Sequence, residues 1–237
     1  IEDVCESHGV VLENGQKAGS VGDVSCFSFY YAHHMSTIEG GMVCTNDPDV
    51  YQRVRMFRSH GMTREANDIE FREGFQNDYP ELNPDFIFAF PAYNTRNNEI
   101  GGVLGRSQLK RLDQIIKRRS LNLERFLNQI DSKRYRTNFK LDGSSNYAFN
   151  LILKEPDDTL AEKLETRMRE NGIEFRRGSA GGGNQLRQPY LQSFIPKNYH
   201  QQFPEVEHVH FYGYYIGNFP DLRPEEIDEI CEIINSV

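Results

Sequence analysis

The sequence predicts an α/β fold in which a long helical stretch joins a β-rich N-terminal part to a small α+β domain. Residues 24–31 and 41–45 are dense in the β-branched and aromatic residues that favour strands. Apolar residues then recur at helical spacing over residues 98–130. After about residue 133, short strand-like and helix-like segments alternate, which is typical of a separate α+β domain.

The composition is that of a globular protein and argues against several functional classes. The chain has 237 residues, enough for one sizeable domain or two modest ones. Its formal net charge of -8 argues against a general binder of nucleic acid or of anionic membranes. No apolar run approaches the roughly 18 residues needed to span a bilayer, and no secretory signal is visible. The four cysteines are dispersed without CxxC spacing, so we expect reduced thiols in a cytoplasmic protein.

The first residues read as the end of a strand followed by acidic side chains. Asp3 falls at this strand end, and Glu6 follows three residues later. Acidic residues in this position also fit the start of a helix, where the helix dipole favours negative charge. Residues 10–22 hold three glycines among polar residues, so we expect a loop or a short hairpin there.

A polar tip separates the two predicted strands within residues 27–47, which read FSFYYAHHMSTIEGGMVCTND. The tip carries His33, His34, Ser36, Thr37 and Glu39. Gly40 and Gly41 close it, and glycine tolerates backbone angles and close approaches that other residues resist. A polar tip between apolar strands is a common place for chemistry in α/β proteins. The two histidines also fit ordinary loop positions, because a short motif is weak evidence on its own.

The spacing within this tip resembles a known cofactor-binding segment. Ser28-Phe29 is followed at the same spacing by His33 where that segment has a lysine, and the following turn reads Ile38-Glu39-Gly40-Gly41. The resemblance is to the DegT/DnrJ/EryC1/StrS sugar aminotransferases, pyridoxal phosphate (PLP) enzymes of fold type I, whose usual turn is Gly-Glu-Gly-Gly. A histidine in place of the lysine, in an Ala-His-His-Met setting, resembles one branch of that family, the nucleotide-sugar 3-dehydratases.

The resemblance implies an aspartate aminotransferase-like fold of which this chain is the C-terminal part. Residues 1–115 would be a remnant of the PLP-binding large domain with the start of a bridging helix, and residues 116–237 the small C-terminal domain. More than a hundred residues that relatives carry before this point are missing, including a phosphate-binding turn and an aromatic ring stacked on the cofactor. We therefore expect the chain to be a fragment or a truncated product.

The substitution of His33 for lysine has a chemical consequence. A lysine amine condenses with the PLP aldehyde, whereas an imidazole forms no stable imine. It can still move protons, because its ordinary pKa of roughly 6.5 suits acid–base work near neutrality. The resemblance therefore implies PLP, or its amine form PMP, bound without a covalent link, with His33 as the catalytic residue.

The resemblance also assigns four cofactor-binding residues. Asp3 would pair with the pyridine nitrogen, Glu6 would lie near the phenolic oxygen, and the Ser28 hydroxyl would contact the phosphate. Asn94, within Tyr93-Asn94-Thr95-Arg96, would reach the cofactor phosphate of the partner in a homodimer. Ser28 also fits a plain strand serine, and Asn94 fits the N-cap of a helix.

In the middle of the chain, the sequence predicts helices on either side of a long connection. Residues 48–58 read as a helix that Asp47-Pro48 starts. Residues 62–93 form a polar and aromatic stretch with three prolines, which we expect to be a functional or partner-packing loop. Residues 98–130 predict one long helix or two in series bridging the domains, with Lys117-Arg118-Arg119 on a solvated face.

The C-terminal third predicts a small α+β domain. Its expected elements are a strand at 147–153, a helix at 159–170 ended by Asn171-Gly172, a strand at 173–176 and a helix at 224–234. Arg176 and Arg177 precede the glycine-rich run 178–184, which fits either a contact to a diphosphate or a structural loop. It does not open an obvious helix, so neither a Rossmann site nor a P-loop is predicted.

His208 and His210 are expected on a strand, where alternate side chains share one face. Two imidazoles on one face could bind a metal, but no third ligand is apparent in the sequence. We expect a substrate contact or a packing role instead, and no metal site.

The resemblance implies a reaction and leaves rivals. The expected reaction removes the C3 hydroxyl of a GDP-linked 4-keto-6-deoxy sugar, with L-glutamate as amine donor, in deoxysugar (O-antigen) biosynthesis. One rival is a sugar 4-aminotransferase, which would need a lysine elsewhere. The iron–sulfur CDP-sugar 3-dehydratases share the histidine but carry clustered cysteines, whereas none lies between Cys44 and Cys231 here. The remaining rival is a non-catalytic pseudoenzyme or interaction subunit.

Overall fold

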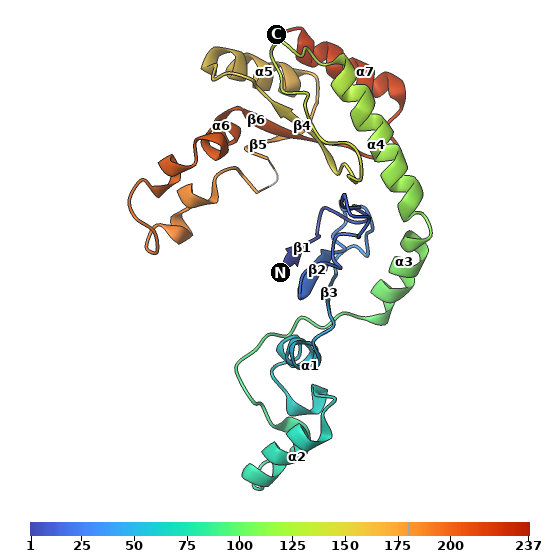
Figure 1. Cartoon of the computed structure of the whole chain (residues 1–237), viewed down its shortest axis with the longest axis vertical. Helices are drawn as coiled ribbons and strands as arrows, with labels where there is room; N and C mark the ends of the chain where they lie inside the picture. Colours follow the sequence, from blue (N-terminus) through green and yellow to red (C-terminus); the bar gives the residue numbers. More distant parts are fainter. Residues whose placement is uncertain (180) are drawn as a thin grey trace. The chain divides into compact units, whose positions relative to one another are not determined.

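The structure, a computed structural model, describes residues 1–179 and 181–237 (Figure 1). It divides into two compact units, Ile1–Leu112 and Asp113–Val237, each with its own three-stranded sheet. None of the helices in the described ranges is long and apolar enough to cross a membrane.

The sheet of the first unit has the order β1-β2-β3. β1 (Glu2–Asp3) pairs in parallel with β2 (Val24–Ser28), which pairs antiparallel with β3 (Gly41–Thr45). The predicted strands are confirmed, although β2 ends at Ser28 because the chain then turns into the tip. An isolated antiparallel bridge between Val11 and Lys17 lies inside the predicted loop or hairpin.

The helices of the first unit include one that the sequence reasoning missed. α1 (Pro48–Phe57) starts where predicted, since the Asp47 carboxylate accepts from the amides of Asp49 and Val50. The expected loop over residues 62–93 is wrong in part, because it contains α2 (Ile69–Asp78) and the short 3-10 helices Thr63–Glu65 and Pro84–Phe86. The signal was Asp68 as N-cap, followed by aromatic residues spaced by four.

Two helices in series occupy residues 98–130. α3 (Glu99–Leu109) begins at the N-cap Asn98, whose side chain accepts from the Gly101 amide at 3.1 Å. α4 (Leu112–Gln129) follows after two residues and begins at the last residue of the first unit. Of the two arrangements that the sequence allowed, the pair of helices is the one observed.

The second unit has an antiparallel sheet of order β4-β6-β5 with three further helices. Its strands are β4 (Ala148–Ile152), β5 (Phe175–Arg177) and β6 (Gly213–Gly217). Its helices are α5 (Asp158–Glu170), α6 (Pro204–Tyr212) and α7 (Pro224–Asn235), with 3-10 turns at Gln185–Arg187, Pro189–Leu191 and Tyr199–Gln202. The strands predicted at 147–153 and 173–176 and the helices predicted at 159–170 and 224–234 are confirmed within one or two residues.

Two expectations for this unit are wrong. His208 and His210 lie on helix α6 and not on a strand, because Pro204 at the first helical position and Glu205 and Glu207 in the first turn favour a helix start there. Arg119 does not lie on a solvated face, because it is only 3% exposed. Its guanidinium donates to the Tyr147 carbonyl at 2.8 Å and to the Asn218 carbonyl.

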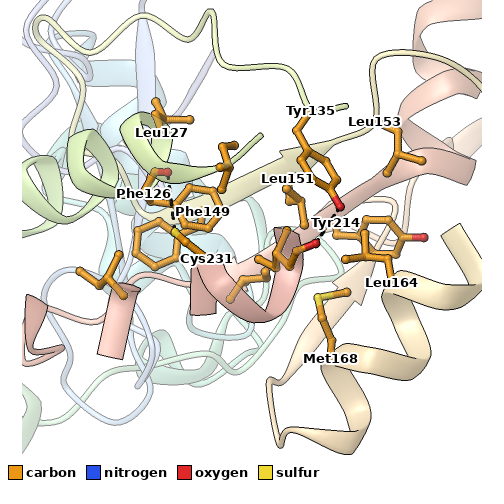
Figure 2. Close-up of a cluster of buried hydrophobic side chains, with 14 of the residues drawn as sticks. Phe126, Leu127, Tyr135, Phe149, Leu151, Leu153, Leu164, Met168, Tyr214 and Cys231 are labelled. Atoms are coloured by element: carbon orange, nitrogen blue, oxygen red, sulfur yellow. Dashed lines mark hydrogen bonds between the residues drawn. The ribbon is translucent and has the colours of Figure 1, made fainter. Parts of the chain in front are cut away.

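The core of the second unit lies on one face of its sheet, between β4 and β6 and the helices α4, α5 and α7 (Figure 2). Phe126 of α4 stacks on Phe149 of β4 with ring centroids 4.6 Å apart. Buried polar groups are also paired, since the Tyr135 hydroxyl donates to the Ile234 carbonyl at 3.2 Å. On the opposite sheet face, Asn150 of β4, Tyr215 of β6 and Arg176 of β5 lie side by side in register.

Candidate functional site

The register of the first sheet sorts the N-terminal candidates onto one face. Asp3 lies beside Cys26, and Ser28 follows two residues later on the same strand. Because residues two apart on a strand share a face, Asp3, Cys26 and Ser28 point to the same side. Phe27 and Phe29 point to the other side. The sheet therefore brings two predicted cofactor-binding residues together.

The polar tip between β2 and β3 is closed by backbone hydrogen bonds. The Phe29 amide donates to the Gly40 carbonyl at 2.8 Å, and the Thr37 amide donates to the Phe29 carbonyl at 2.9 Å. A side chain at Gly40 would collide with Thr37, since an added Cβ would lie 2.5 Å from its hydroxyl oxygen. Ile38, where the resemblance expects glycine, adopts φ 74°, a conformation that is strained for a β-branched residue.

The orientation of the His33 ring indicates which of its two nitrogens carries the hydrogen. Its Nδ1 lies 3.3 Å from the Ser28 carbonyl oxygen. Because a carbonyl only accepts, Nδ1 must carry the hydrogen, which places the lone pair of the neutral ring on Nε2. The backbone amide of His33 donates to the Tyr30 carbonyl at 3.0 Å, and the two rings meet edge to face. The imidazole is thus held from its Nδ1 side by the strand that carries Ser28.

Asp3 and His33 are electrostatically coupled. Hydrogen bonds from the thiol and the amide of Cys5 lower the pKa of Asp3, and the positive charge of His33 lowers it further. Asp3 is therefore ionised at neutral pH. The carboxylate and the imidazole accordingly lie close enough to influence each other, although they are thirty residues apart in sequence.

A buried histidine that sequence reasoning missed lies behind the tip. His8 is only 3% exposed and contacts the rings of Phe27, Phe29 and His34. Burial, and then the charge of His33, lowers the pKa of His8 to about 4, so that it stays neutral near pH 7. Its contacts are to residues nineteen or more positions away, which is why the local sequence gave no signal.

Glu6 and Asn94 have different surroundings. Glu6 is half-buried in a turn after β1, so the alternative of a helix start at this point is not observed. Asn94 is exposed, pairs with Ser59 in an isolated bridge and accepts from the Arg96 side chain at 3.3 Å. It does not cap a helix, because Asn98 caps α3.

Helix α3 packs closely on the tip through small residues. The Asn97 side chain fills the space at Gly40 and Gly101, where an added Cβ at Gly101 would lie 2.9 Å from Asn97 Oδ1. The Thr37 methyl group likewise lies against Gly105. These contacts hold the tip against helix α3. In the sequence, the glycines of α3 were the feature from which such close packing could have been predicted.

The two predicted arginines lie on β5 of the second unit and are exposed. The guanidinium of Arg176 lies over the Tyr215 ring at 5.6 Å. Arg177 lies over Phe211 at 5.8 Å and 3.8 Å from the Glu165 carboxylate. Both are placed where an anion could reach them.

The two predicted histidines of α6 do not share a face. His208 Nε2 lies 2.6 Å from the Leu153 carbonyl, and His210 Nδ1 accepts from the Asn184 amide at 3.1 Å. Residues two apart on a helix point in nearly opposite directions. The described residues contain no group of three or more His, Cys, Asp or Glu side chains arranged to hold a metal.

His210 belongs to a loop–helix clasp, formed by Gly183, Asn184 and Arg187 after β5 and by Glu207 and His210 of α6. The Glu207 carboxylate accepts from the Asn184 side chain at 2.8 Å and from Arg187 Nε at 2.9 Å. Arg187 lowers the pKa of Glu207 to about 2. A side chain at Gly183 would collide with the His210 ring. Part of the predicted glycine-rich run, Ala180, lies outside the described residues.

Comparison with known proteins identifies relatives across nearly the whole chain. The family model for the DegT/DnrJ/EryC1/StrS aminotransferase family matches residues 1–235. The GDP-4-keto-6-deoxy-D-mannose 3-dehydratases of Escherichia coli O55:H7 and Yersinia pseudotuberculosis are 30% and 32% identical over 235 residues, 99% of this chain. The chain covers 60% and 59% of their lengths, so it spans about three-fifths of the curated relatives it matches.

A solved structure of such a relative also resembles this chain. The crystal structure of GDP-4-keto-6-deoxymannose-3-dehydratase with a trapped PLP-glutamate geminal diamine superimposes with a TM-score of 0.79 and 29% identity. The superposition covers 97% of this chain and 59% of that chain. The predicted α/β fold of a PLP-dependent transferase is therefore confirmed. This chain belongs to the DegT/DnrJ/EryC1/StrS aminotransferase family.

Proposed function

We propose that this chain carries the catalytic histidine of a PLP/PMP-dependent nucleotide-sugar 3-dehydratase. The proposed reaction removes the C3 hydroxyl of a GDP-linked 4-keto-6-deoxyhexose, with L-glutamate as amine donor, in deoxysugar biosynthesis for O-antigen. The names of the relatives and the PLP–glutamate species in the solved structure support this substrate pair. Because the chain spans about three-fifths of those relatives, the activity of the whole protein is part of the proposal.

The proposal is carried by His33, whose spacing from Ser28-Phe29 is the spacing at which the family resemblance expects the cofactor lysine. Its Nδ1–H points at the Ser28 carbonyl, which leaves Nε2 as the basic nitrogen. An imidazole cannot bind the cofactor aldehyde as a stable imine, so this position can transfer protons but cannot anchor the cofactor covalently. A sugar 4-aminotransferase would need a lysine in this role, and residues 28–41 contain none.

The residues around His33 fit the cofactor chemically. Asp3 is held ionised, which suits a carboxylate that pairs with a protonated pyridine nitrogen. Ser28 Oγ accepts from the Tyr30 amide at 3.3 Å, so its hydroxyl hydrogen is left to donate to a phosphate oxygen. Both side chains lie on the same face of the sheet. An acceptor at Asp3 and a donor at Ser28 therefore suit a protonated ring nitrogen and a phosphate of one ligand.

The catalytic role follows from the protonation states. When bound, the cofactor supplies an electron sink that makes a neighbouring C–H bond acidic. His33 Nε2 accepts the proton from that carbon, and the Ser28 carbonyl stabilises the resulting imidazolium through Nδ1–H.

The remaining assignments complete the proposal. Glu6 would lie near the phenolic oxygen, and Asn94 would reach the partner's cofactor phosphate in a homodimer; its exposed position is compatible with that role. Arg176 and Arg177 would meet the diphosphate of the sugar nucleotide. We propose no substrate contact for His208 and His210, since both hold backbone groups within their own unit. Residues 1–115 and 116–237 would correspond to the large and small family domains.

The glutamate half-reaction tests the role of His33. Wild-type protein loaded with PLP is mixed with L-glutamate, and the cofactor absorbance reports conversion to PMP. His33→Asn should bind PLP with unchanged affinity but convert it about 10²–10⁴-fold more slowly, the usual range for loss of a general base. His34→Asn is the matched control and should convert normally if it folds. Normal conversion by His33→Asn would contradict the proposed proton transfer.

A further inference from the structure

The side of the second unit's sheet that lies opposite the hydrophobic core carries polar residues. We call it the polar sheet face and define it by Asn150, Tyr215 and Arg176, which are neighbours in register. Arg176 is exposed, and its guanidinium lies 5.6 Å from the centre of the Tyr215 ring. Adjacent residues of a strand point to opposite faces, and Arg177 accordingly pairs with Glu165 at 3.8 Å. Of the two predicted arginines, Arg176 is therefore the one on the polar sheet face.

A second arginine reaches this face at the end of the sheet. Arg119 of α4 donates to the carbonyls of Tyr147 and Asn218, which directly precede β4 and directly follow β6. Its guanidinium lies 5.3 Å from the centre of the Tyr147 ring, and the centres of the Tyr147 and Tyr215 rings are 5.8 Å apart. A row of contacts therefore runs from Arg119 through the two tyrosines to Arg176.

Neither of these two arginines forms an ion pair, unlike most arginines of the second unit. The arginines of this unit that pair with a carboxylate are Arg125, Arg134, Arg136, Arg167, Arg169, Arg177, Arg187 and Arg223. The exceptions among its described residues are Arg118, Arg119 and Arg176. Arg118 donates to the Leu222 carbonyl at 2.7 Å. The two cations without a carboxylate partner on the page of this fold are thus joined by the same row of tyrosine contacts.

The charge of Arg119 is the costly part of this arrangement. Arg119 is only 3% exposed, and its Nε has no hydrogen-bond partner among the described residues. The groups that its guanidinium does contact are two carbonyls and the Tyr147 ring, all of them neutral. Burial lowers the pKa of Arg119, yet a guanidinium stays charged in proteins. Since a buried charge without an opposite charge is strongly destabilising, a bound anion nearby would compensate it.

We propose that the polar sheet face binds the diphosphate of the sugar nucleotide, with Arg176 as the contact residue and the buried Arg119 as a second positive charge behind the tyrosines. This inference rests on the proposed function and narrows its diphosphate contact from the arginine pair to Arg176. Each phosphate of the diphosphate carries a negative charge, which suits a site with two unpaired cations. Tyr147 and Tyr215 position the two guanidinium groups through cation–π contacts. Asn150 adds a neutral amide on the same face.

The test measures the binding of GDP and of inorganic pyrophosphate to the whole chain by isothermal titration calorimetry, with guanosine as the probe that lacks phosphate. Arg176→Gln removes the exposed charge, and Arg119→Met removes the buried charge while keeping most of the side-chain volume. Lys117→Gln, at an exposed site on α4, is the matched control for the loss of one positive charge. Circular dichroism checks the folding of each variant. Arg176→Gln, at an exposed position, carries the test if Arg119→Met does not fold.

We expect Arg176→Gln to weaken the binding of GDP and of pyrophosphate about tenfold or more, because it removes hydrogen bonds to a charged group. Arg119→Met should weaken both severalfold, because a buried charge acts on the anion through a medium of low dielectric constant. Lys117→Gln should bind GDP as the wild type does, and no variant should change the binding of guanosine.

Unchanged GDP binding by Arg176→Gln would overturn the inference, and so would a folded wild type that binds neither GDP nor pyrophosphate. Unchanged GDP binding by a folded Arg119→Met would contradict the role of the buried charge. If Arg176→Gln instead slowed the conversion of PLP by L-glutamate and left GDP binding intact, the face would serve the amine donor and the inference would be wrong.

Failure of the proposed function would give a different result. A wild-type chain that binds neither PLP nor PMP would contradict that function. A GDP affinity that depends on Arg176 in the same chain would still support an anion site on the polar sheet face.

Discussion

The two compact units hold their candidate residues by different means. In residues 1–112, strand pairing holds Asp3 and Ser28, hydrogen bonds to the Ser28 and Tyr30 carbonyls hold His33, and the buried hydrophobic residues are few and scattered. Residues 113–237 instead have a continuous apolar core across the sheet and three helices. The first unit also exposes many large apolar side chains, including Ile100, Val103 and Tyr93. The hydrogen bonds that place the candidate residues are thus concentrated in the first unit, whereas the buried apolar surface is concentrated in the second.

Because of this difference, the placement of the candidate site residues and the stability of the fold can be tested by separate substitutions. A side chain in the core of the second unit contributes through buried area, whereas a residue of the tip contributes through a few directional bonds. Substitutions in the two regions should therefore differ in size and in what they change. The predictions below begin with the largest expected effect.

Phe149→Ala should destabilise the second unit most strongly. Phe149 is fully buried and stacks on Phe126, and loss of a buried phenylalanine typically costs about 3–5 kcal/mol. Urea unfolding followed by circular dichroism measures the loss. Val206→Ala, at an exposed site on α6, is the control and should change stability little. Equal stability of Phe149→Ala and wild type would contradict the described core.

Gly183→Ala should open the loop–helix clasp without unfolding the unit. The added methyl group meets the His210 ring, and Gly183 has φ 85°, so the residue is strained as well as crowded. Strain of this kind costs on the order of 1–3 kcal/mol. Hydrogen exchange should show faster exchange at the Asn184 amide than in wild type. Gly172→Ala, also at positive φ but with open space around it, separates backbone strain from the collision.

Acidification should loosen the same clasp. Burial, and then the charges of Arg187 and Arg177, lowers the pKa of His210, whereas Glu207 and the Gly182 backbone oppose this. The unfolded chain therefore binds more protons than the folded one below about pH 6.5, so this contribution is present above that pH and is lost as the pH falls. Exchange at the Asn184 amide, corrected for intrinsic rates, should rise over this range.

His210→Gln tests whether that pH response comes from the ring. The glutamine carbonyl can accept from the Asn184 amide but does not titrate. If the Asn184 amide kept the same pH response in His210→Gln, the assignment to His210 would be wrong.

Ile38→Gly should produce the smallest change, and in the stabilising direction. Ile38 is 68% exposed, so its removal loses little burial. Relief of the left-handed strain returns about 1–2 kcal/mol, against a glycine entropy cost of roughly 0.5–1 kcal/mol. The expected gain in the free energy of unfolding, measured with urea, is therefore up to about 1.5 kcal/mol. A clear loss of stability would show that the Ile38 side chain makes a packing contact that outweighs the strain.

The parts of the molecule that could be predicted from sequence are those whose signals are local. The spacing from Ser28 to His33 and the cap at Asp47 lie within a few residues of the features that they predict. Arg119 was misplaced because its partners, Tyr147 and Asn218, are distant in sequence. His210 was misassigned because histidine alternating with valine resembles a strand, although Pro204 starts a helix.

The contacts around the candidate site could likewise not be predicted from local sequence. Residue types at Asp3 and Ser28 suggested their roles, but the support from Cys5 depends on how the chain folds back after β1. The clasp joins Asn184 to Glu207 across a connection that has no regular pattern in the sequence. Long-range contacts of this kind follow from packing, and no short motif encodes them.

The most direct test of the central claim is borohydride reduction of the PLP-loaded chain followed by intact mass and peptide mapping. The account predicts that the wild type binds PLP and yields no reduced adduct, because His33 occupies the lysine position. His33→Lys should yield one adduct, mapped to residue 33. A wild-type adduct on any lysine would contradict the lysine-free site, and a His33→Lys protein that binds PLP without forming an adduct would show that residue 33 does not face the cofactor.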